Sequence, residues 1–442
     1  MPLVLKDKCF SLRPPTVFGT QLYGDTSPSS KYYADLNASG ASWVRVEIYW
    51  SSVEPVNTTP ANYDWSELDL ILAAADSSCI NMVATLNGNP EWASTSREGP
   101  IDKVNISELA EFMGALVERY DGDGISDASG SPKVLYFEMY NEPDAGPSPT
   151  ADRWGDKGAQ YAQMLAAVYP AVKAASLEAK VVFGGMAYDW WEKQSGPFVE
   201  RFLEDVLAAG GGQSFDVMNF HAYPLFRNNW TQNGVGLKEK TAAIRAKLQQ
   251  YGVSKPIIIT ETGWHSNAPA NAPSSDEVEI RCIVVLFTQS LAAQVDMAVW
   301  WPLADVGGFY TYDSGLVTNA TPPVRKPAFF AYHFMSDELR SATYERSLST
   351  AETGNARVEA YKFKDPARNQ SIYIVWQNPQ QDQWLNPNQV TPAKTMTLAA
   401  AQATVRDVFG NSTLVKDGDD GKNDGRITLQ VKAVPMYVEI RN

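Results

Sequence analysis

The chain has 442 residues, of which 44% are hydrophobic and 11% aromatic, and this composition is typical of a globular protein with one large and one modest domain. Its 37 basic and 51 acidic residues give a formal net charge of −14, which repels nucleic acids and anionic membranes, so we expect neither as a partner. Every apolar run is far shorter than the roughly 20 residues that span a bilayer.

Short β-rich runs alternate with longer amphipathic segments from residue 17 to residue 340. The sequence predicts strands over residues 17–24, 43–50, 81–88, 134–141, 181–187, 215–223, 256–264 and 297–305. It predicts helices over residues 31–40, 64–79, 106–120, 157–176, 197–209, 237–251, 276–294 and 327–340.

Eight such units predict a closed (β/α)8 barrel, because parallel strands need helical crossovers and eight of them complete the ring. A doubly wound open sheet is the alternative fold. It would usually have fewer strands and a glycine-rich phosphate turn after the first, whereas Gly19 and Gly24 do not form a G-x-G-x-x-G motif.

After residue 341, strand-like runs follow one another without helices, separated by Asp, Gly, Asn and Pro turns. This pattern predicts a small antiparallel β-domain, most simply a β-sandwich. We therefore expect an α/β barrel over residues 15–341 and a β-sandwich over residues 342–442, with residues 1–14 available to pair with the sandwich. The sandwich should cover apolar helix surface at Phe329, Phe330 and Phe334.

The three cysteines, Cys9, Cys79 and Cys282, are far apart and form no C-x-x-C pair. The spacing indicates neither a disulfide framework nor a zinc cluster, and we expect ordinary buried or free thiols. The amino terminus lacks the long apolar segment of a secretory signal. Two locations stay open: the cytoplasm, or a secreted or extracytoplasmic location if a leader has been removed.

Functional groups of such a barrel project from the carboxyl ends of its strands, which reduces the search to a short set of residues. These are Arg45, Glu47, Tyr49, Asn87, Trp92, Asn141, Glu142, His221, Tyr223, Glu261, Trp264, Trp300, Trp301 and Asp305.

Glu142 and Glu261 stand out because each ends an apolar run, where an unpaired carboxylate would cost several kcal/mol. One interpretation is that each is a structural carboxylate paired with Arg45 or another cation. The other is that the two face each other across a substrate, since carboxylates about 5 to 5.5 Å apart suit retaining glycoside hydrolysis. In that case the ionised carboxylate and the partly dry pocket would raise the pKa of the other toward about 6.

Asn141-Glu142-Pro143, and Glu261 within Ile-Thr-Glu-Thr-Gly-Trp, resemble the strand-four and strand-seven motifs of glycoside hydrolase clan A. These proteins are retaining glycosidases on (β/α)8 barrels. Within the clan, the barrel-plus-sandwich layout is most similar to family 39, over essentially the whole chain. The resemblance implies that Glu142 is the general acid/base and Glu261 the nucleophile.

The resemblance also implies roles for four neighbours. Asn141 would bind the 2-hydroxyl of the sugar, and Arg45 would lie beside Glu261 and keep it ionised. Tyr223 would donate a hydrogen bond to the same carboxylate, and His221 would line the floor of the site.

Several aromatic residues and one amide are candidates for substrate contact. Trp92, Trp264, Trp300 and Trp301 fall at strand ends, where an indole can stack on a sugar ring, although tryptophan is more often a core residue. We expect one of Trp300 and Trp301 to floor the site, with Asn87 nearby. Two long loops carry further residues that form either extra subsites or ordinary surface: Asp189, Trp190, Trp191, Phe226, Asn228, Asn229 and Trp230.

The segment from Asp121 to Asp127 spaces carboxylates like part of a calcium loop, but it lacks the bidentate Glu of an EF-hand. A structural Ca²⁺ at Asp121, Asp123 and Asp127 is one interpretation, and a solvated turn is the simpler one. The predicted chemistry requires no cofactor. With three histidines and no H-x-H, H-E-x-x-H or G-x-S-x-G motif, the chain does not fit a metal-dependent or serine hydrolase.

We therefore expect a retaining O-glycosidase that cleaves a β-type bond in an oligo- or polysaccharide. The expected partner is the carbohydrate substrate, and the oligomeric state is unknown. A transglycosylase with the same two glutamates and a non-hydrolytic carbohydrate-binding barrel are the alternatives. The net acidity and the few basic residues at strand ends argue against a uronate substrate.

Overall fold

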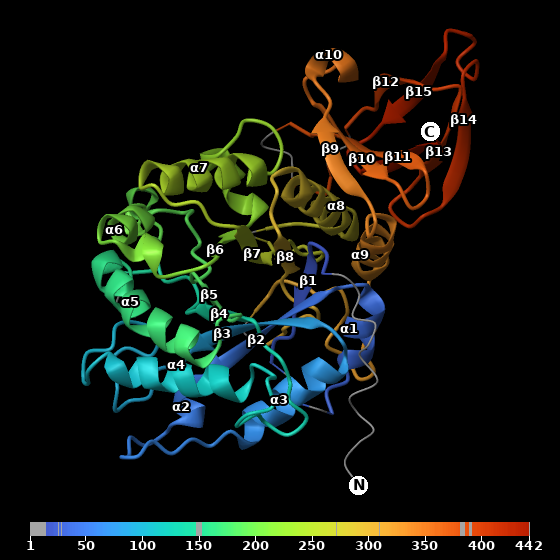
Figure 1. The fold of residues 1–442 in the computed structure, drawn as a ribbon. Helices are drawn as coiled ribbons and strands as arrows, with labels where there is room; N and C mark the ends of the chain where they lie inside the picture. The colour runs from blue at the N-terminus through green and yellow to red at the C-terminus, as the bar shows by residue number, and fades with distance from the viewer. Residues whose placement is uncertain are drawn as a thin grey trace.

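The computed structural model describes residues 15–441 except for 25, 28, 147–152, 271, 309, 381–384 and 389–390. Within that part, helices surround a barrel of eight parallel strands, and an antiparallel β-domain follows it (Figure 1). Residues 1–14, with Cys9 and the predicted pairing of this segment, lie outside the described residues.

The barrel strands follow one another in the order β5-β4-β3-β2-β1-β8-β7-β6, and isolated bridges between Val182 and Val217 and between Met186 and Phe220 connect the last gap. All eight predicted strands are present. Their bounds are β1 Phe18–Gln21, β2 Trp43–Tyr49, β3 Asn81–Asn87, β4 Tyr136–Met139, β5 Lys180–Val182, β6 Met218–Ala222, β7 Ile257–Thr262 and β8 Met297–Trp300.

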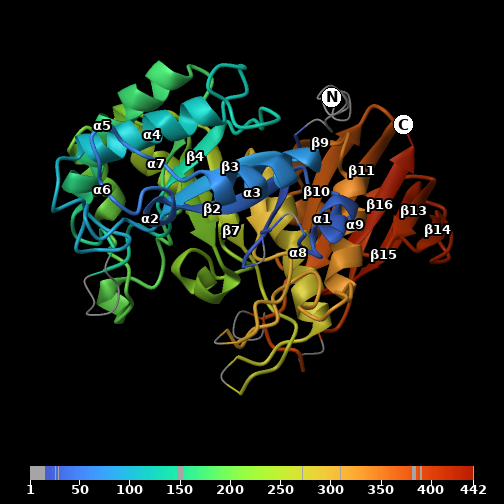
Figure 2. The ribbon, with the colours of Figure 1, turned by 90° about the horizontal axis from the view of Figure 1, so that it is seen from below.

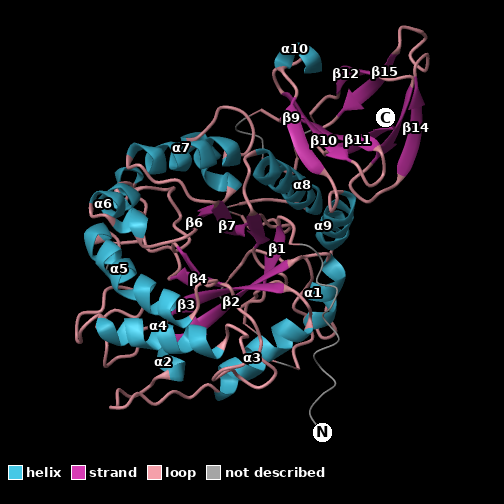
Figure 3. Cartoon of the chain, viewed as in Figure 1, coloured by secondary structure: helices cyan, strands magenta, loops and turns pink. Residues whose placement is uncertain are grey.

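The predicted helices also form, and they ring the strands in Figure 3. They are α1 Tyr33–Ser39, α3 Ser66–Ser77, α4 Ser107–Arg119, α5 Gly158–Ala175, α6 Phe202–Ala208, α7 Leu237–Gln250, α8 Asp276–Ala292 and α9 Pro327–Glu338. Short turns that the sequence did not predict are α2 Trp50–Val53, η1 Glu192–Gln194, η2 Gly211–Gln213 and η3 Pro224–Asn229. None of the helices in the described part of the chain is both long and apolar enough to cross a membrane.

The core of the barrel domain lies between the strands and the helices. In α4, Leu109, Met113 and Leu116 recur at spacings of three and four and are fully buried, as their periodicity predicts. Each such side chain contributes roughly 1.5–3 kcal/mol by leaving water. A second, smaller apolar layer fills the inside of the barrel near the amino-terminal ends of its strands.

The carboxy-terminal β-domain packs a six-stranded sheet, ordered β14-β13-β16-β11-β10-β9, against a two-stranded sheet of β12 and β15. Its strands are β9 Thr343–Ser347, β10 Val358–Asp365, β11 Gln370–Gln377, β12 Lys394–Ala399, β13 Gln402–Arg406, β14 Ser412–Lys416, β15 Arg426–Val431 and β16 Met436–Arg441, and α10 Thr350–Thr353 precedes β10. This arrangement confirms the predicted barrel with an antiparallel sandwich. Strands β9 and β14 were not predicted.

The β-domain meets the barrel at α7, α8 and α9. Lys238 of α7 and Gln289 of α8 donate to Glu359 of β10, and Figure 2 shows α9 beside the β-domain. Phe334 packs edge-on against Tyr437 of β16, with ring centroids 5.1 Å apart. Phe330 is 48% exposed, so the expectation that the sandwich covers it is wrong. Phe330 lies one turn before Phe334 on the same side of α9, so the cover that Phe334 receives from Tyr437 does not extend one turn further along the helix.

The cysteines differ from expectation in one respect. Cys282 is a buried free thiol, but Cys79 is disulfide-bonded, so the prediction that all three are free thiols is wrong. Separation along the chain does not limit which cysteines meet in the folded protein.

Candidate active site

Side chains alternate along the barrel strands, and this alternation places the polar side chains of the site inside the barrel. Trp43, Val83, Val217 and Ile258 form part of the inner apolar layer, and the residues two positions further along, Arg45, Thr85, Asn219 and Thr260, are polar and buried. In β4, Tyr136 and Glu138 follow the same rule. Because successive side chains of a strand point to opposite faces, this spacing stacks a polar layer on the apolar one.

Arg45 and Glu138 form the centre of that polar layer. The Arg45 side chain is fully buried, and its Nε and Nη2 donate to the Glu138 carboxylate at 2.8 and 3.0 Å. Glu138 also accepts hydrogen bonds from Thr85, Asn219, Thr260 and the backbone N–H of Gly185. Burial opposes its ionisation, but the charge and hydrogen bonds of Arg45 outweigh that effect and lower the pKa of Glu138.

Glu261 is attached to this centre. Arg45 Nη1 donates to Glu261 Oε1 at 2.6 Å, and the Tyr223 hydroxyl donates to Oε2 at 2.8 Å. A bulge in β7 makes the contact possible, since Phe220 pairs with Ile259 but His221 pairs with Glu261. The extra residue lets both Thr260 and Glu261 place their side chains in the site.

Glu142 lies just past the end of β4, in a left-handed backbone conformation with φ +45°. Its N–H donates to the Gly185 carbonyl at 3.0 Å, which holds this uncommon conformation. Arg153 Nη1 donates to Glu142 Oε2 at 3.0 Å, and His221 Nδ1 lies 3.2 Å from Oε1.

These partners decide the protonation of Glu142. Burial opposes its ionisation, but the hydrogen bond and charge of His221 and the nearby Arg153 lower its pKa to about 2. The direction is opposite to the rise toward 6 that was expected, so that expectation is wrong. It considered only the negative charge of the second glutamate and did not foresee the contacts of Glu142 with Arg153 and His221.

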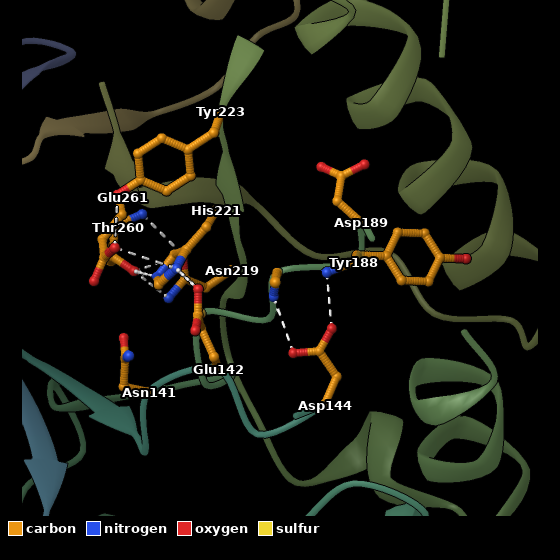
Figure 4. A network of polar contacts seen from close by, with 12 residues as sticks. Asn141, Glu142, Asp144, Tyr188, Asp189, Asn219, His221, Tyr223, Thr260 and Glu261 are labelled. Atoms are coloured by element: carbon orange, nitrogen blue, oxygen red, sulfur yellow. Dashed lines mark hydrogen bonds and ion pairs between the residues drawn. The ribbon is translucent and has the colours of Figure 1, made fainter. Parts of the chain in front are cut away.

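The two glutamates face each other across His221 (Figure 4). His221 Nδ1 lies 3.2 Å from Glu142 Oε1 and 3.6 Å from Glu261 Oε2, and one oxygen of each glutamate lies within 4.8 Å of the other and of the imidazole. Gly185 leaves room for this ring, because a Cβ at that position would stand 2.2 Å from His221 Nε2.

Asn141, Glu47 and Asn87 extend the polar surface around the pair. Asn141 Oδ1 accepts a hydrogen bond from Arg45 Nη2 at 2.8 Å. Glu47 accepts from the Tyr49 hydroxyl at 2.8 Å and from Asn87 Nδ2 at 3.4 Å. Burial, with the added negative charge of Glu261, raises the pKa of Glu47, although Arg45 works in the opposite direction.

The structure separates Trp300 from Trp301. Trp300 is fully buried and its indole N–H donates to the Ser314 carbonyl, so it cannot stack on a sugar, and its prediction as a substrate contact is wrong. Val299 belongs to the inner layer of the barrel, so alternation turns Trp300 outward toward the helices and Trp301 inward. Trp301 is half-buried between Tyr23 and Tyr310, with ring centroids 5.7 and 5.0 Å apart.

Two other predicted tryptophans have structural contacts. Trp264 is buried and donates to Ser274 Oγ at 3.0 Å, so the prediction that it contacts substrate is wrong. Trp92 packs edge-on against Trp50 and donates to the Glu54 carbonyl, and its contact with substrate stays a prediction.

Two loops beside the site are tied together by buried polar contacts. Lys240 of α7 donates to Asp189 and to the His221 carbonyl, and Trp230 Nε1 donates to Asp189 at 2.6 Å. Next to this cluster, Trp190 is 45% exposed and stacks on Phe226, with ring centroids 6.1 Å apart. Asn229 bonds to Gln194 and Asp189, and Trp191 packs edge-on against Trp230. A role of Trp191, Asn228 and Asn229 in extra subsites stays a prediction.

Several residues of the site were missed from the sequence, among them Glu138, Asp144 and Arg153. Glu138 is a single carboxylate inside an apolar strand, and its even spacing from Tyr136 could have placed it in the barrel interior. Asp144, whose buried carboxylate accepts the N–H groups of Ala187 and Tyr188, joins the segment after β4 to that after β5, and burial raises its pKa to about 6. Arg153 lies in a loop, where no periodicity indicates which side chain it will meet.

Two groups of possible metal ligands occur among the described residues. Glu142, His221 and Glu261 are already contacted by Arg45, Arg153 and Tyr223, and two guanidinium groups so close oppose a bound cation. Asp121, Asp123 and Asp127 lie within 4.8 Å of one another, but their carboxylates accept backbone N–H groups of their own turn. A structural Ca²⁺ at this turn therefore stays a prediction.

Comparison with known proteins gives a match over most of the barrel. The model of the cellulase family, glycosyl hydrolase family 5, matches residues 10–305. No curated protein matches the chain.

Several solved structures share the fold. A family 39 glycoside hydrolase from the gut symbiont Bacteroides cellulosilyticus WH2 is 16% identical with a TM-score of 0.70, covering 97% of this chain and 81% of that one. A glucosidase from Croceicoccus marinus is 15% identical with a TM-score of 0.66, covering 97% and 96%. A family 30 endoxylanase from Clostridium papyrosolvens C71 is 13% identical with a TM-score of 0.58, covering 98% of each chain. At these identities the likeness concerns the fold.

Proposed function

The chain belongs to the cellulase family, glycosyl hydrolase family 5, and from that premise we propose that it is a retaining glycosidase that cleaves a β-type O-glycosidic bond in an oligo- or polysaccharide. The observation that carries the proposal is the approach of a Glu142 oxygen to within 4.8 Å of a Glu261 oxygen. Inverting enzymes need about 6.5–9.5 Å between their carboxyl groups to admit water, so this spacing supports double displacement.

Glu261 is the nucleophile in this proposal. Its oxygens accept hydrogen bonds from Arg45 and Tyr223, which orient the carboxylate from the barrel wall. It attacks the anomeric carbon, forming an ester bond while the bond from that carbon to the leaving oxygen breaks. Attack by a pre-oriented group avoids much of the entropic cost of bringing reactants together.

Glu142 is the general acid and then the general base. As the leaving oxygen departs it takes a proton from Glu142, which becomes a carboxylate. Water then gives a proton to Glu142 and its oxygen to the anomeric carbon, which releases Glu261. Asn141, held through Oδ1 by Arg45, would present its amide N–H groups to the 2-hydroxyl of the sugar.

The surroundings favour a neutral sugar in a chain. Four carboxylates surround the two guanidinium groups of the site, and this excess of negative charge would repel a uronate: Glu98, Glu138, Glu142 and Glu261 against Arg45 and Arg153. Trp301 offers a half-buried aromatic face near the catalytic pair, and Trp190 with Phe226 offers a second at the outer loops. Two aromatic faces at separate points can stack on different sugar units of the same polysaccharide.

The stereochemistry of the first product tests the mechanism. The full-length protein is incubated with soluble β-glucans, xylans and aryl β-glycosides, and proton NMR follows the anomeric signals in the first minutes. We expect the β-anomer to appear before mutarotation. An α-anomer as the first product would rule out double displacement.

The same reactions separate hydrolysis from transfer. Mass spectrometry at high acceptor concentration would show longer oligosaccharides as the main early products of a transglycosylase. Free reducing sugars as the main products support hydrolysis. Binding of the polysaccharides with no product of either kind would leave a non-hydrolytic barrel and overturn the proposed function.

A further inference from the structure

We propose that Arg153 is a positioning residue that Glu142 and Glu98 share, and that the balance between these two partners decides when Glu142 can hold the proton needed for catalysis. This inference rests on the proposed function, because it concerns the general acid of that reaction.

Arg153 bridges the two carboxylates with different parts of its guanidinium. Its Nη1 donates to Glu142 Oε2 at 3.0 Å, and its Nε donates to Glu98 Oε2 at 2.9 Å. Glu98 belongs to the segment between β3 and α4, and Arg153 to the segment between β4 and α5. The side chains of Arg153, Glu142 and Glu98 are 24%, 22% and 27% exposed, so the bridge lies at the rim of the site, where it can rearrange.

A cation at this position opposes the acid step. A carboxyl group whose pKa lies well below its ordinary value is almost always ionised at neutral pH. Bond cleavage with a poor leaving group needs that proton on Glu142. The guanidinium must therefore withdraw from Oε2 before the leaving oxygen can take its place.

Glu98 remains a partner of the Arg153 guanidinium while the guanidinium is withdrawn from Glu142. When a sugar on the leaving-group side reaches Oε2, Arg153 can keep its bond to Glu98, so no buried cation is left unpaired. After the proton has passed to the leaving oxygen, Glu142 is a carboxylate again and Arg153 can return. The renewed pairing stabilises the ionised form until water must be deprotonated.

Other charged and titratable groups also act on Glu142 and must be kept constant in a test. They are His221 and Tyr223 at the end of β6, Glu261 in β7, Asp144 beyond β4, and Glu98 through Arg153. His221 contacts both glutamates, so a change there would disturb the nucleophile as well. Arg153 and Glu98 contact neither Glu261 nor Arg45 through any hydrogen bond of the described residues.

The test compares Arg153→Met with Glu98→Gln in the full-length protein. The basic limb of the pH profile of kcat/KM, with a poor leaving group, reports the acid of the free enzyme. We expect Arg153→Met to move this limb upward by about one pH unit or more, because the cation is gone. Glu98→Gln should move it downward, because Arg153 then has Glu142 as its main partner.

Two further variants serve as controls. Arg153→Lys keeps the charge and should restore most of the wild-type profile. Arg201→Met removes an exposed arginine of the α6 N-terminus that pairs with Asp205, and it should leave the profile unchanged. Thermal unfolding of each variant shows whether it folds, and Glu98→Gln alone still tests the direction if Arg153→Met does not fold.

Shifts of the basic limb in opposite directions would support the proposal, since a purely structural role would lower activity without separating the two variants. Limbs that stay within about 0.3 pH unit of wild type in folded variants would overturn it. Failure of the proposed function has a different signature, because the wild-type protein itself would then show no retained hydrolysis.

Discussion

Glu261 and Glu142 face the same space and share His221 of β6, but Glu261 is also held from the barrel wall by Arg45, whereas the other side-chain partner of Glu142 lies in a loop. Glu261 accepts hydrogen bonds from Arg45, a fully buried residue of β2, and from Tyr223. Glu142 accepts from Arg153, a partly exposed residue that also binds Glu98. In the proposed mechanism Glu261 keeps one task while Glu142 gains and loses a proton, and the comparison teaches that a buried partner suits the first task and a partly exposed one the second.

Replacement of Glu261 by Gln should have the largest effect. The amide keeps the shape of the side chain but cannot form the ester intermediate, so we expect kcat to fall by about 10⁴-fold or more while sugar binding persists. Initial rates and isothermal titration calorimetry with an oligosaccharide measure the two quantities. A fall of less than tenfold would mean that another group is the nucleophile.

Replacement of Glu142 by Gln should distinguish the two carboxylates. We expect a loss of about 10²–10⁴-fold with a poor leaving group, because the acid no longer donates. An activated aryl glycoside should retain fast formation of the glycosyl-enzyme, visible as a burst, with slow release. Equal losses with both kinds of leaving group would contradict the assignment of Glu142 as the acid.

Replacement of Glu138 by Gln tests whether the buried Arg45–Glu138 pair behind Glu261 stabilises the barrel. It leaves Arg45 buried with one carboxylate fewer, so we expect about 3 kcal/mol less free energy of unfolding. Chemical denaturation measures the change. Glu178→Gln, which breaks the exposed pair with Lys133, is the matched control and should cause a much smaller loss, because exposed ion pairs add little to stability. Similar losses of unfolding free energy in the two variants would show that the buried pair adds no more stability than an exposed one.

Replacement of Trp190 by Ala should have the smallest effect. The residue is exposed and lies beside the site rather than in it, so we expect kcat/KM to fall by about tenfold for a polysaccharide and to stay near wild type for an aryl monoglycoside. Kinetics on oligosaccharides of increasing length measure this difference. A loss independent of chain length would remove Trp190 from the substrate path.

The sequence predicted the barrel because its βα rhythm depends on local periodicity. All eight strands and their helices are close to the predicted ranges, and Glu142 and Glu261 lie together as their strand-end positions imply. What the sequence missed depends on contacts between distant segments. Arg153 meets Glu142 through a loop, and Trp300 and Trp301 exchange roles with a one-residue change of register. Strands β9 and β14 are short and mostly exposed, so their apolar pattern is weak.

The missing side chain at Gly185 matters when this site is transferred to another protein. A single methyl group at that position would occupy the space of the imidazole and approach the carboxylate of Glu138 to 2.8 Å. The ring would have to shift, which would disturb its contacts with both glutamates. A transplanted site would therefore have to include an empty volume as one of its parts, and a search for the acidic pair alone would also select scaffolds in which the imidazole has no room.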